Sequence, residues 1–184
     1  MDRLRSPTVA LALLTLAPLG AVAGGDADTS WPQFRGRQSA GGGDGVRLPE
    51  TWDGAAGKGV IWETPIAGLA HSSPVVWGDS VFVTTAISSQ QGASFKRGLY
   101  GEGTASQDMS PHRFQVLGLD RRTGKVRWTR TAFQGPPREK RHIKATYVNS
   151  SPATNGEYVV AFFGSQGLYA YDMKGRLKWK RDLG

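Results

Sequence analysis

Short segments in which apolar and polar residues alternate recur along the chain beyond residue 80. They are rich in β-branched and aromatic side chains, which is typical of half-buried β-strands. The segments that we expect to form strands are Val81–Thr85, Phe114–Leu119, Val126–Thr131, Tyr158–Phe163, Leu168–Tyr171 and Leu177–Arg181. Because no window after residue 23 shows the 3.6-residue period of an amphipathic helix, the pattern predicts an all-β protein.

Glycine-containing turns separate these segments. They are Trp77-Gly78-Asp79, Asn155-Gly156-Glu157, Thr123-Gly124 and Lys174-Gly175. Glycine adopts the positive φ that tight hairpin turns require, so each turn is expected to join two antiparallel strands.

The chain repeats itself. Residues 72–83 (SSPVVWGDSVFV) return without a gap as residues 150–161 (SSPATNGEYVVA), 78 positions later. A second unit, residues 118–128 (GLDRRTGKVRW), returns as residues 170–179 (AYDMKGRLKW), and a third copy survives as residues 58–62 (KGVIW). With the longer connections set aside, the repeat approaches the period of about 40 to 50 residues that is typical of a four-stranded propeller blade.

Two insertions interrupt the repeat, around Ile87–His112 and Phe133–Lys144. In a meander of four strands, the first connects strands B and C, and the second leads from strand D to strand A of the next blade. Both therefore emerge on one face of the propeller, opposite the tight turns. Loops on a rigid scaffold are where binding residues concentrate, so we expect a ligand-binding face there.

The second repeat unit resembles the Ala-x-Asp-x-x-Thr-Gly-x-x-x-Trp docking motif of pyrroloquinoline quinone (PQQ) type β-propellers. The first copy has Gly in the Ala position, and the second lacks the Thr and one spacer residue. The opening Trp31–Gly36 (WPQFRG) is similar to the start of exported PQQ-like repeat proteins. A large indole on the outer strand needs a small residue opposite it for neighbouring sheets to approach. The residues expected to serve this structural docking are Trp62, Gly118, Asp120, Gly124, Trp128, Ala170, Asp172, Gly175 and Trp179.

The N-terminal region divides from the repeats by composition. Arg3 and Arg5, the apolar run Val9–Leu19 and the small residues 21–23 predict a signal peptide over residues 1–23, and therefore export to the periplasm or secretion. Residues 24–57 are expected to be an extended segment or linker, which includes the Gly-rich residues 36–45. No apolar run is long enough to span a membrane.

The remaining residues, 58–184, are expected to form part of a PQQ-like propeller. They divide into a closing outer strand at 58–64, one blade at 66–131 and a second blade at 145–184. Closed propellers have about four to eight blades, and two blades leave open sheet edges. We therefore interpret the chain as an N-terminal piece of a larger wheel, of eight blades by the resemblance, with C-terminal blades needed to close the ring. Symmetric assembly of several two-blade chains is the alternative.

Charge and chemistry narrow the possible functions. The chain has 23 Lys and Arg against 15 Asp and Glu, 25 Gly and no Cys, which excludes disulfides, thiolate metal sites and N-terminal cysteine lipidation within it. Alternating cations on residues 176–181 are typical of a solvated sheet edge. No nucleic-acid recognition motif is present. The candidate ligand-binding residues on the long loops are His71, His112, Arg138, Lys140, Arg141, His142 and Lys144.

Three functions are compatible with these residues. The first is a non-catalytic exported scaffold that binds or assembles proteins, as the resemblance to the propeller of the outer-membrane assembly lipoprotein implies. The second is a PQQ-dependent alcohol or sugar dehydrogenase, for which the resemblance implies PQQ and Ca²⁺; none of its ligand residues can be matched in this chain. The third is a face that binds anionic ligands through residues 138–144. The three histidines, together with Asp108, have no metal-motif spacing and are better explained as loop residues. We favour the scaffold because no catalytic constellation is apparent.

Overall fold

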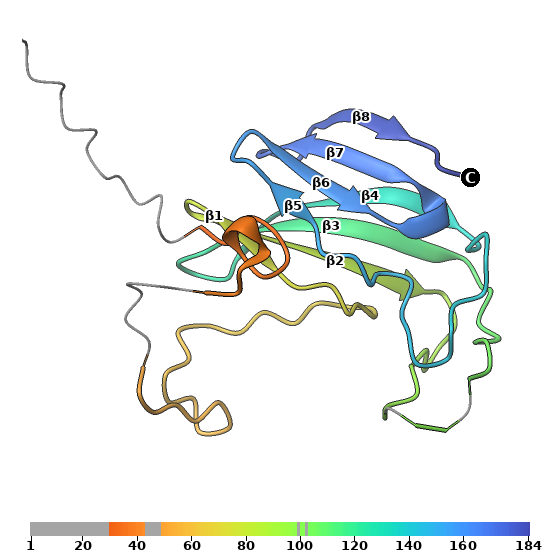
Figure 1. The fold of residues 1–184 in the computed structure, drawn as a ribbon, viewed down its shortest axis with the longest axis horizontal. Coiled ribbons are helices and arrows are strands. Elements are labelled where there is room, and N and C mark those ends of the chain that lie inside the picture. The colour runs from red at the N-terminus through yellow and green to blue at the C-terminus, as the bar shows by residue number, and fades with distance from the viewer. Residues whose placement is uncertain (1–29, 43–48, 99, 102) are drawn as a thin grey trace, which may run out of the picture.

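The computed structural model describes residues 30–42, 49–98, 100–101 and 103–184, and it contains two four-stranded antiparallel sheets (Figure 1). The first sheet has the order β1-β2-β3-β4 and the second has the order β5-β6-β7-β8. Their strands are β1 (Val75–Trp77), β2 (Ser80–Ser88), β3 (His112–Asp120), β4 (Val126–Gly135), β5 (Ala153–Thr154), β6 (Tyr158–Phe162), β7 (Leu168–Asp172) and β8 (Leu177–Arg181). Among the described residues the only helical turns are two short 3₁₀ segments, η2 (Arg37–Ser39) and η3 (Gly164–Gln166). The predicted all-β fold is confirmed.

The third and fourth strands of each sheet pair in the same register. Gly118 in β3 lies opposite Trp128 in β4, and Ala170 in β7 lies opposite Trp179 in β8. In both sheets a β-bulge follows the small residue directly. The sequence repeat therefore corresponds to one structural unit built twice.

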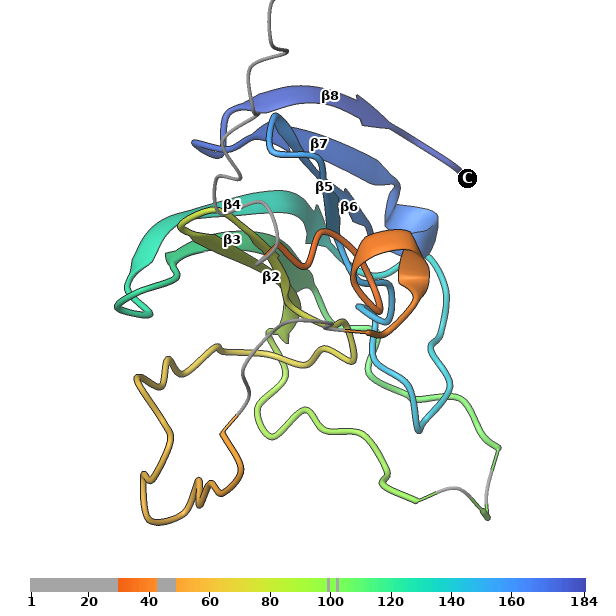
Figure 2. The same ribbon diagram turned by 60° about the vertical axis from the view of Figure 1, so that its left-hand side comes forward.

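The main core lies between the sheets (Figures 1 and 2). The facing side chains alternate along the strands, because successive residues of a strand point to opposite faces of its sheet. Several of them are completely buried, including Phe82 and Phe114 from the first sheet and Val159 and Ala161 from the second. Because each blade is a single layer, this mutual burial supplies much of the apolar contact that holds the two sheets together.

Indole rings on the outer strands fasten each unit to the next. The Trp128 indole N–H donates to the Met173 carbonyl (3.1 Å), and its ring lies where a Cβ on Gly175 would be, 2.6 Å from the Trp128 Cδ2. Gly175 also has a φ of 75°, which favours glycine on conformational grounds. Arg130, two residues after the indole, donates through Nε to the Gly175 carbonyl (2.7 Å).

The same contacts recur on the other face of the first sheet. Trp62 donates to the Arg121 carbonyl (2.8 Å) and its ring covers Gly124, while Thr64 donates to the Gly124 carbonyl (2.7 Å). Trp62 and Ile66 pack on the buried side chains of Val81, Leu117 and Leu119. Residues 58–64, expected to be a closing outer strand, form no ladder with a strand in the described part of the chain. They are held by these side-chain contacts.

The predicted second insertion began too early. β4 continues to Gly135, so Phe133 belongs to the strand and not to the loop. The reason is packing, because the Phe133 ring meets Phe114 of β3 at a centroid distance of 5.6 Å. A β-bulge between Phe114 and Gln115 shifts the register there and keeps both rings on the core side.

The N-terminal part of the expected linker contacts β1 and β5, which are the first strands of the two sheets. Trp31 exchanges backbone hydrogen bonds with Val76 of β1 (2.9 and 2.8 Å). The next carbonyl, of Pro32, accepts from the Thr154 N–H of β5 (2.8 Å). Residues 31 and 32 therefore connect the inner edges of the two sheets. The predicted signal peptide lies outside the described residues, and within them no helix is long and apolar enough to cross a membrane.

Candidate ligand-binding face

Two long loops lie together at the end of the sheets opposite the tight turns. They are residues 89–111, between β2 and β3, and residues 136–149, between β4 and β5 (Figure 2). Backbone bonds join them, from Lys96 N to Ile143 O (2.9 Å), Ile143 N to Thr104 O (2.9 Å) and Ser106 N to Arg141 O (2.8 Å). We call the described residues between β2 and β3 (89–98, 100–101 and 103–111), together with residues 136–149, the paired-loop surface. Topology placed both loops on one face, and the structure shows in addition that they pair with each other.

Arg141 lies at the centre of the paired-loop surface and is buried, with 8% of its surface exposed. Its guanidinium donates to the carbonyls of Ala145 (2.6 Å), Ser94 (2.6 Å) and Ile143 (3.5 Å), and lies over the Tyr147 ring. These acceptors belong to both loops, so this one side chain fixes their separation. The sequence marked Arg141 as one surface cation of a basic run, but the structure buries it.

A second buried cluster lies where β3 begins. The Asp108 carboxylate accepts from the Ser110 hydroxyl (2.5 Å) and from the Ser110 N–H (3.1 Å). His112 is buried, its Nδ1 bonds to the Ser110 carbonyl (2.6 Å), and its Nε2 lies 3.5 Å from the Asp108 Oδ2. Burial opposes ionisation of Asp108, but the hydroxyls of Ser110 and Ser88, the Ser110 N–H and the charge of His112 outweigh it and lower its pKa.

Serine, histidine and aspartate are thus adjacent, but not in the order that catalysis requires. In a catalytic triad the imidazole bonds to the serine hydroxyl and the carboxylate orients the imidazole. Here the Ser110 hydroxyl donates to Asp108, and His112 bonds to the Ser110 carbonyl. The hydroxyl therefore lacks an imidazole base, and the carboxylate that accepts from it is a weak base because its pKa is lowered. Tyr147 completes the cluster through a bond from its hydroxyl to the Asp108 carbonyl (3.1 Å), and burial raises the Tyr147 pKa.

The other predicted cations are occupied by contacts within the protein. Arg138 forms a bidentate pair with Asp182 beyond β8 (2.5 and 2.7 Å). Lys140 donates to the Gln107 side chain (3.1 Å), and Lys144 donates to the Tyr100 carbonyl (2.6 Å). The basic run Arg138–Lys144 is therefore used largely to hold loops and strand ends together.

The remaining predicted histidines lie at separate places on this face. The His71 ring meets Phe95 edge to face at 4.6 Å, while its backbone N–H donates to the Val148 carbonyl (2.9 Å). His142 is exposed and pairs through its backbone with Ala105. In the described ranges no three His, Asp or Glu side chains gather closely enough to hold a metal ion.

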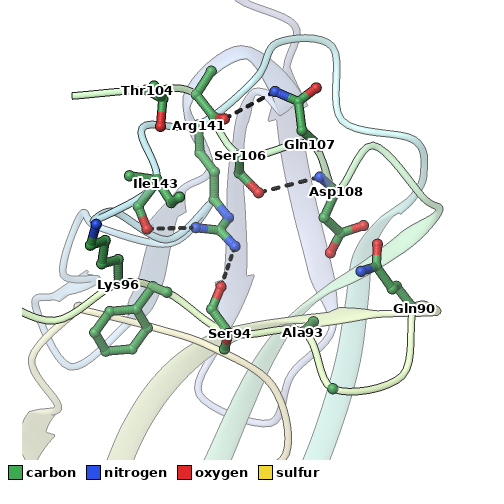
Figure 3. A pocket seen from close by; sticks show the side chains of 13 residues that line it. Gln90, Ala93, Ser94, Lys96, Thr104, Ser106, Gln107, Asp108, Arg141 and Ile143 are labelled. Carbon is green, nitrogen blue, oxygen red and sulfur yellow. Dashed lines mark hydrogen bonds between the residues drawn. The ribbon is translucent and has the colours of Figure 1, made fainter. Parts of the chain in front are cut away.

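A cavity of about 570 Å³ lies between the paired loops (Figure 3). Of the predicted ligand-binding residues, only Arg141 lines it. Its other walls carry amides, hydroxyls and one aromatic ring, from Gln90, Ser94, Phe95, Thr104, Ser106 and Gln107, and two charged side chains, Lys96 and Asp108. Sequence reasoning missed these residues, because polar residues inside an insertion carry no periodic pattern. The sequence feature that could have pointed to these residues was the insertion of their loop into the repeat.

The docking residues lie at the opposite end. Asp120 Oδ1 accepts from the N–H groups of Arg122 and Thr123 (both 2.9 Å) and from the Thr123 hydroxyl, while Arg127 pairs with Oδ2. Arg127 above all, and then Thr123, lower the Asp120 pKa to about 2. Asp172 holds the corresponding turn of the second sheet, and bonds from the backbone of Arg176 and Lys174 lower its pKa.

Two sheets that carry the same indole and glycine contacts define a repeat protein of the PQQ-like class. The family model described as "Outer membrane protein assembly factor BamB" matches residues 50–184, which is most of the chain, and the protein belongs to this family. No curated protein matches the chain. The family is associated with protein interaction, and membership leaves open whether a given member is catalytic.

Proposed function

We propose that this chain is part of an exported PQQ-like propeller that acts as a non-catalytic binding or assembly module, and that the paired-loop surface is its binding face. The name of the matched family supports a role in protein assembly. Export rests on the residue pattern of positions 1–23.

One observation carries the proposal. The chemically active side chains of the paired-loop surface are used to hold the two loops in one fixed shape. Arg141 ties three carbonyls of both loops, and Asp108, Ser110 and His112 bond to one another rather than to a solvent-facing reaction site. Rigid loops on a sheet scaffold suit recognition, because little ordering entropy is lost when a partner binds.

Site-specific photocrosslinking in the organism that makes the protein tests the face. A photoreactive residue replaces Gln107, which is exposed on the paired-loop surface, and Lys174, exposed in a tight turn at the opposite end, serves as the matched control. We expect a discrete protein adduct from position 107 and none from position 174. Adducts from position 174 alone, or equally from both positions, would contradict the proposal.

The dehydrogenase alternative is tested separately. The purified protein is titrated with PQQ and Ca²⁺ while the cofactor absorbance is followed. We expect no saturable spectral change at micromolar cofactor. Saturable binding accompanied by oxidation of an alcohol or sugar would replace the non-catalytic assignment with an enzymatic one.

A further inference from the structure

The cavity between the paired loops contains a buried positive charge. Arg141 lines the cavity and is more than nine-tenths buried. None of the ion pairs among the described residues involves it, and its acceptors are carbonyl oxygens. Two cationic residues, Arg141 and Lys96, and one carboxylate, Asp108, line the cavity, so the lining carries one net positive charge. The carbonyl acceptors of Arg141 do not neutralise its charge.

The position of the guanidinium is fixed. It reaches from the loop of residues 136–149 towards the loop of residues 89–111, where Ser94 holds one of its nitrogens (Figure 3). The Tyr147 ring lies under its plane at 5.7 Å. A cation preorganised in this way binds an anion without first losing side-chain entropy.

Most of the remaining lining matches hydroxyl groups, and Asp108, whose Oδ2 accepts no hydrogen bond among the described residues, adds a carboxylate acceptor for them. Gln90 and Gln107 contribute carboxamides, and Ser94, Thr104 and Ser106 contribute hydroxyls; both kinds of group can donate and accept. Phe95 adds one aromatic ring. The volume, about 570 Å³, lies within the range of small-molecule sites, and the lining is more polar than those sites usually are.

We propose that this cavity binds a small polyhydroxylated carboxylate, of the uronic acid class, whose carboxylate pairs with Arg141 and whose hydroxyls meet the amide and hydroxyl lining. The inference rests on the proposed function, since it names a ligand for the same face. It assigns the anion site to the buried Arg141 and not to the cations at positions 138, 140 and 144, which contact other parts of the protein.

Calorimetric titration of the full chain with matched probes tests the ligand class. Sodium glucuronate supplies the carboxylate and hydroxyls, glucose has the same ring without the carboxylate, and inorganic phosphate is an anion without the ring. We expect glucuronate to bind about tenfold or more tightly than glucose, because glucose lacks the carboxylate that would bond to the charged Arg141. The affinity for glucuronate should fall as the salt concentration is raised. Equal binding of glucose, tighter binding of phosphate, or no binding of glucuronate would overturn the inference.

Two kinds of variant locate the binding. Arg141→Gln removes the charge and should abolish the preference for glucuronate, but it also removes bonds that hold the loops. Ala93→Phe therefore provides a second test, since Ala93 lines the cavity and lies outside the bonds of Arg141. It should reduce glucuronate binding about tenfold or more, whereas Ala55→Phe, at an exposed position elsewhere, should leave it unchanged. Unchanged binding in Ala93→Phe would contradict the site.

The two proposals fail in different ways. If glucuronate does not bind while position 107 still gives a discrete adduct, the ligand class is wrong and the binding face stands. If glucuronate binds but no adduct forms at position 107, the cavity is supported as a ligand site and the protein-assembly function is not.

Discussion

The two sheets are built from one repeat, but the described residues cover both faces of the first sheet only. Val75 and Phe82 of the first sheet are completely buried against the second. The positions 78 residues later, Ala153 and Val160, lie on the outer face of the second sheet together with Trp179. Ala153 is exposed, and Trp179 keeps 42% of its surface accessible. Equal sequence units therefore make unequal contributions to stability, because the neighbour and not the repeat decides what is buried.

This comparison explains why the three related tryptophans should differ. Trp128 contacts the second sheet, Trp62 contacts the first sheet from a segment without a ladder, and Trp179 faces no sheet in the described part of the chain. The following predictions test that order.

Trp128→Ala should have the largest effect. It removes the indole from Gly175, ends the bond to the Met173 carbonyl and opens a gap beside Phe82. We expect the free energy of unfolding to fall by about 3 kcal/mol, the low end of the range for aromatic truncations, because the ring is only partly buried. Denaturant unfolding measures this, with Trp52→Ala at an exposed position as the control. A loss no larger than that of the control would show that the indole does not hold the sheets together.

Trp62→Ala should have an intermediate and local effect. Residues 60–66 are held by side-chain contacts, so loss of the indole should release this segment while the two sheets stay folded. We expect faster proteolytic cleavage near residues 58–66 and a fall of about 1 to 2 kcal/mol in the free energy of unfolding. Cleavage rates equal to those of the parent protein would contradict the assignment.

Trp179→Ala should change the free energy of unfolding by less than about 1 kcal/mol, because its ring is already partly in water. The same denaturant experiment measures the change, with Trp128→Ala as the positive reference. A loss as large as that of Trp128→Ala would mean that a further sheet covers this face in solution. The second sheet would then be covered on both faces, like the first.

The smallest effect concerns the two turn carboxylates. Arg127→Gln should raise the Asp120 pKa from about 2 towards the ordinary value of 3.8 and leave Asp172 unchanged. Because the folded-state pKa of Asp120 lies below its unfolded value, its contribution is present above about pH 4 and is lost as the pH falls towards 2. Carboxyl NMR titration measures both groups. An unshifted Asp120 in Arg127→Gln would show that Thr123 and the backbone alone hold its pKa low.

The fold could be predicted because it repeats. The recurring Ser-Ser-Pro and Asp-Gly-Trp units placed the strands in register, and the pairs Gly118 with Trp128 and Ala170 with Trp179 follow from that spacing. The extension of β4 to Gly135 could not be predicted from the repeat, since it depends on Phe133 packing on Phe114 across a bulge.

The candidate site was predictable in position but not in chemistry. Strand topology put the two insertions on one face, and the histidines and cations there marked it. Which cation is buried depends on contacts between loops far apart in sequence, such as Arg141 with Ser94, and no local pattern encodes those. The loop of residues 89–111 also lacks a counterpart in the second sheet, where a short connection that contains η3 joins β6 and β7, so the repeat gives no template for it.

The backbone bonds of Trp31 and Pro32 to β1 and β5 bear on how the chain matures. These residues leave the ribosome before either strand does, and long before Thr154 is made. Trp31 and Pro32 can therefore bind along β1 and β5 only after both blades have formed. Their docking would follow the formation of both blades, and protection of the Trp31 amide from hydrogen exchange would report that step.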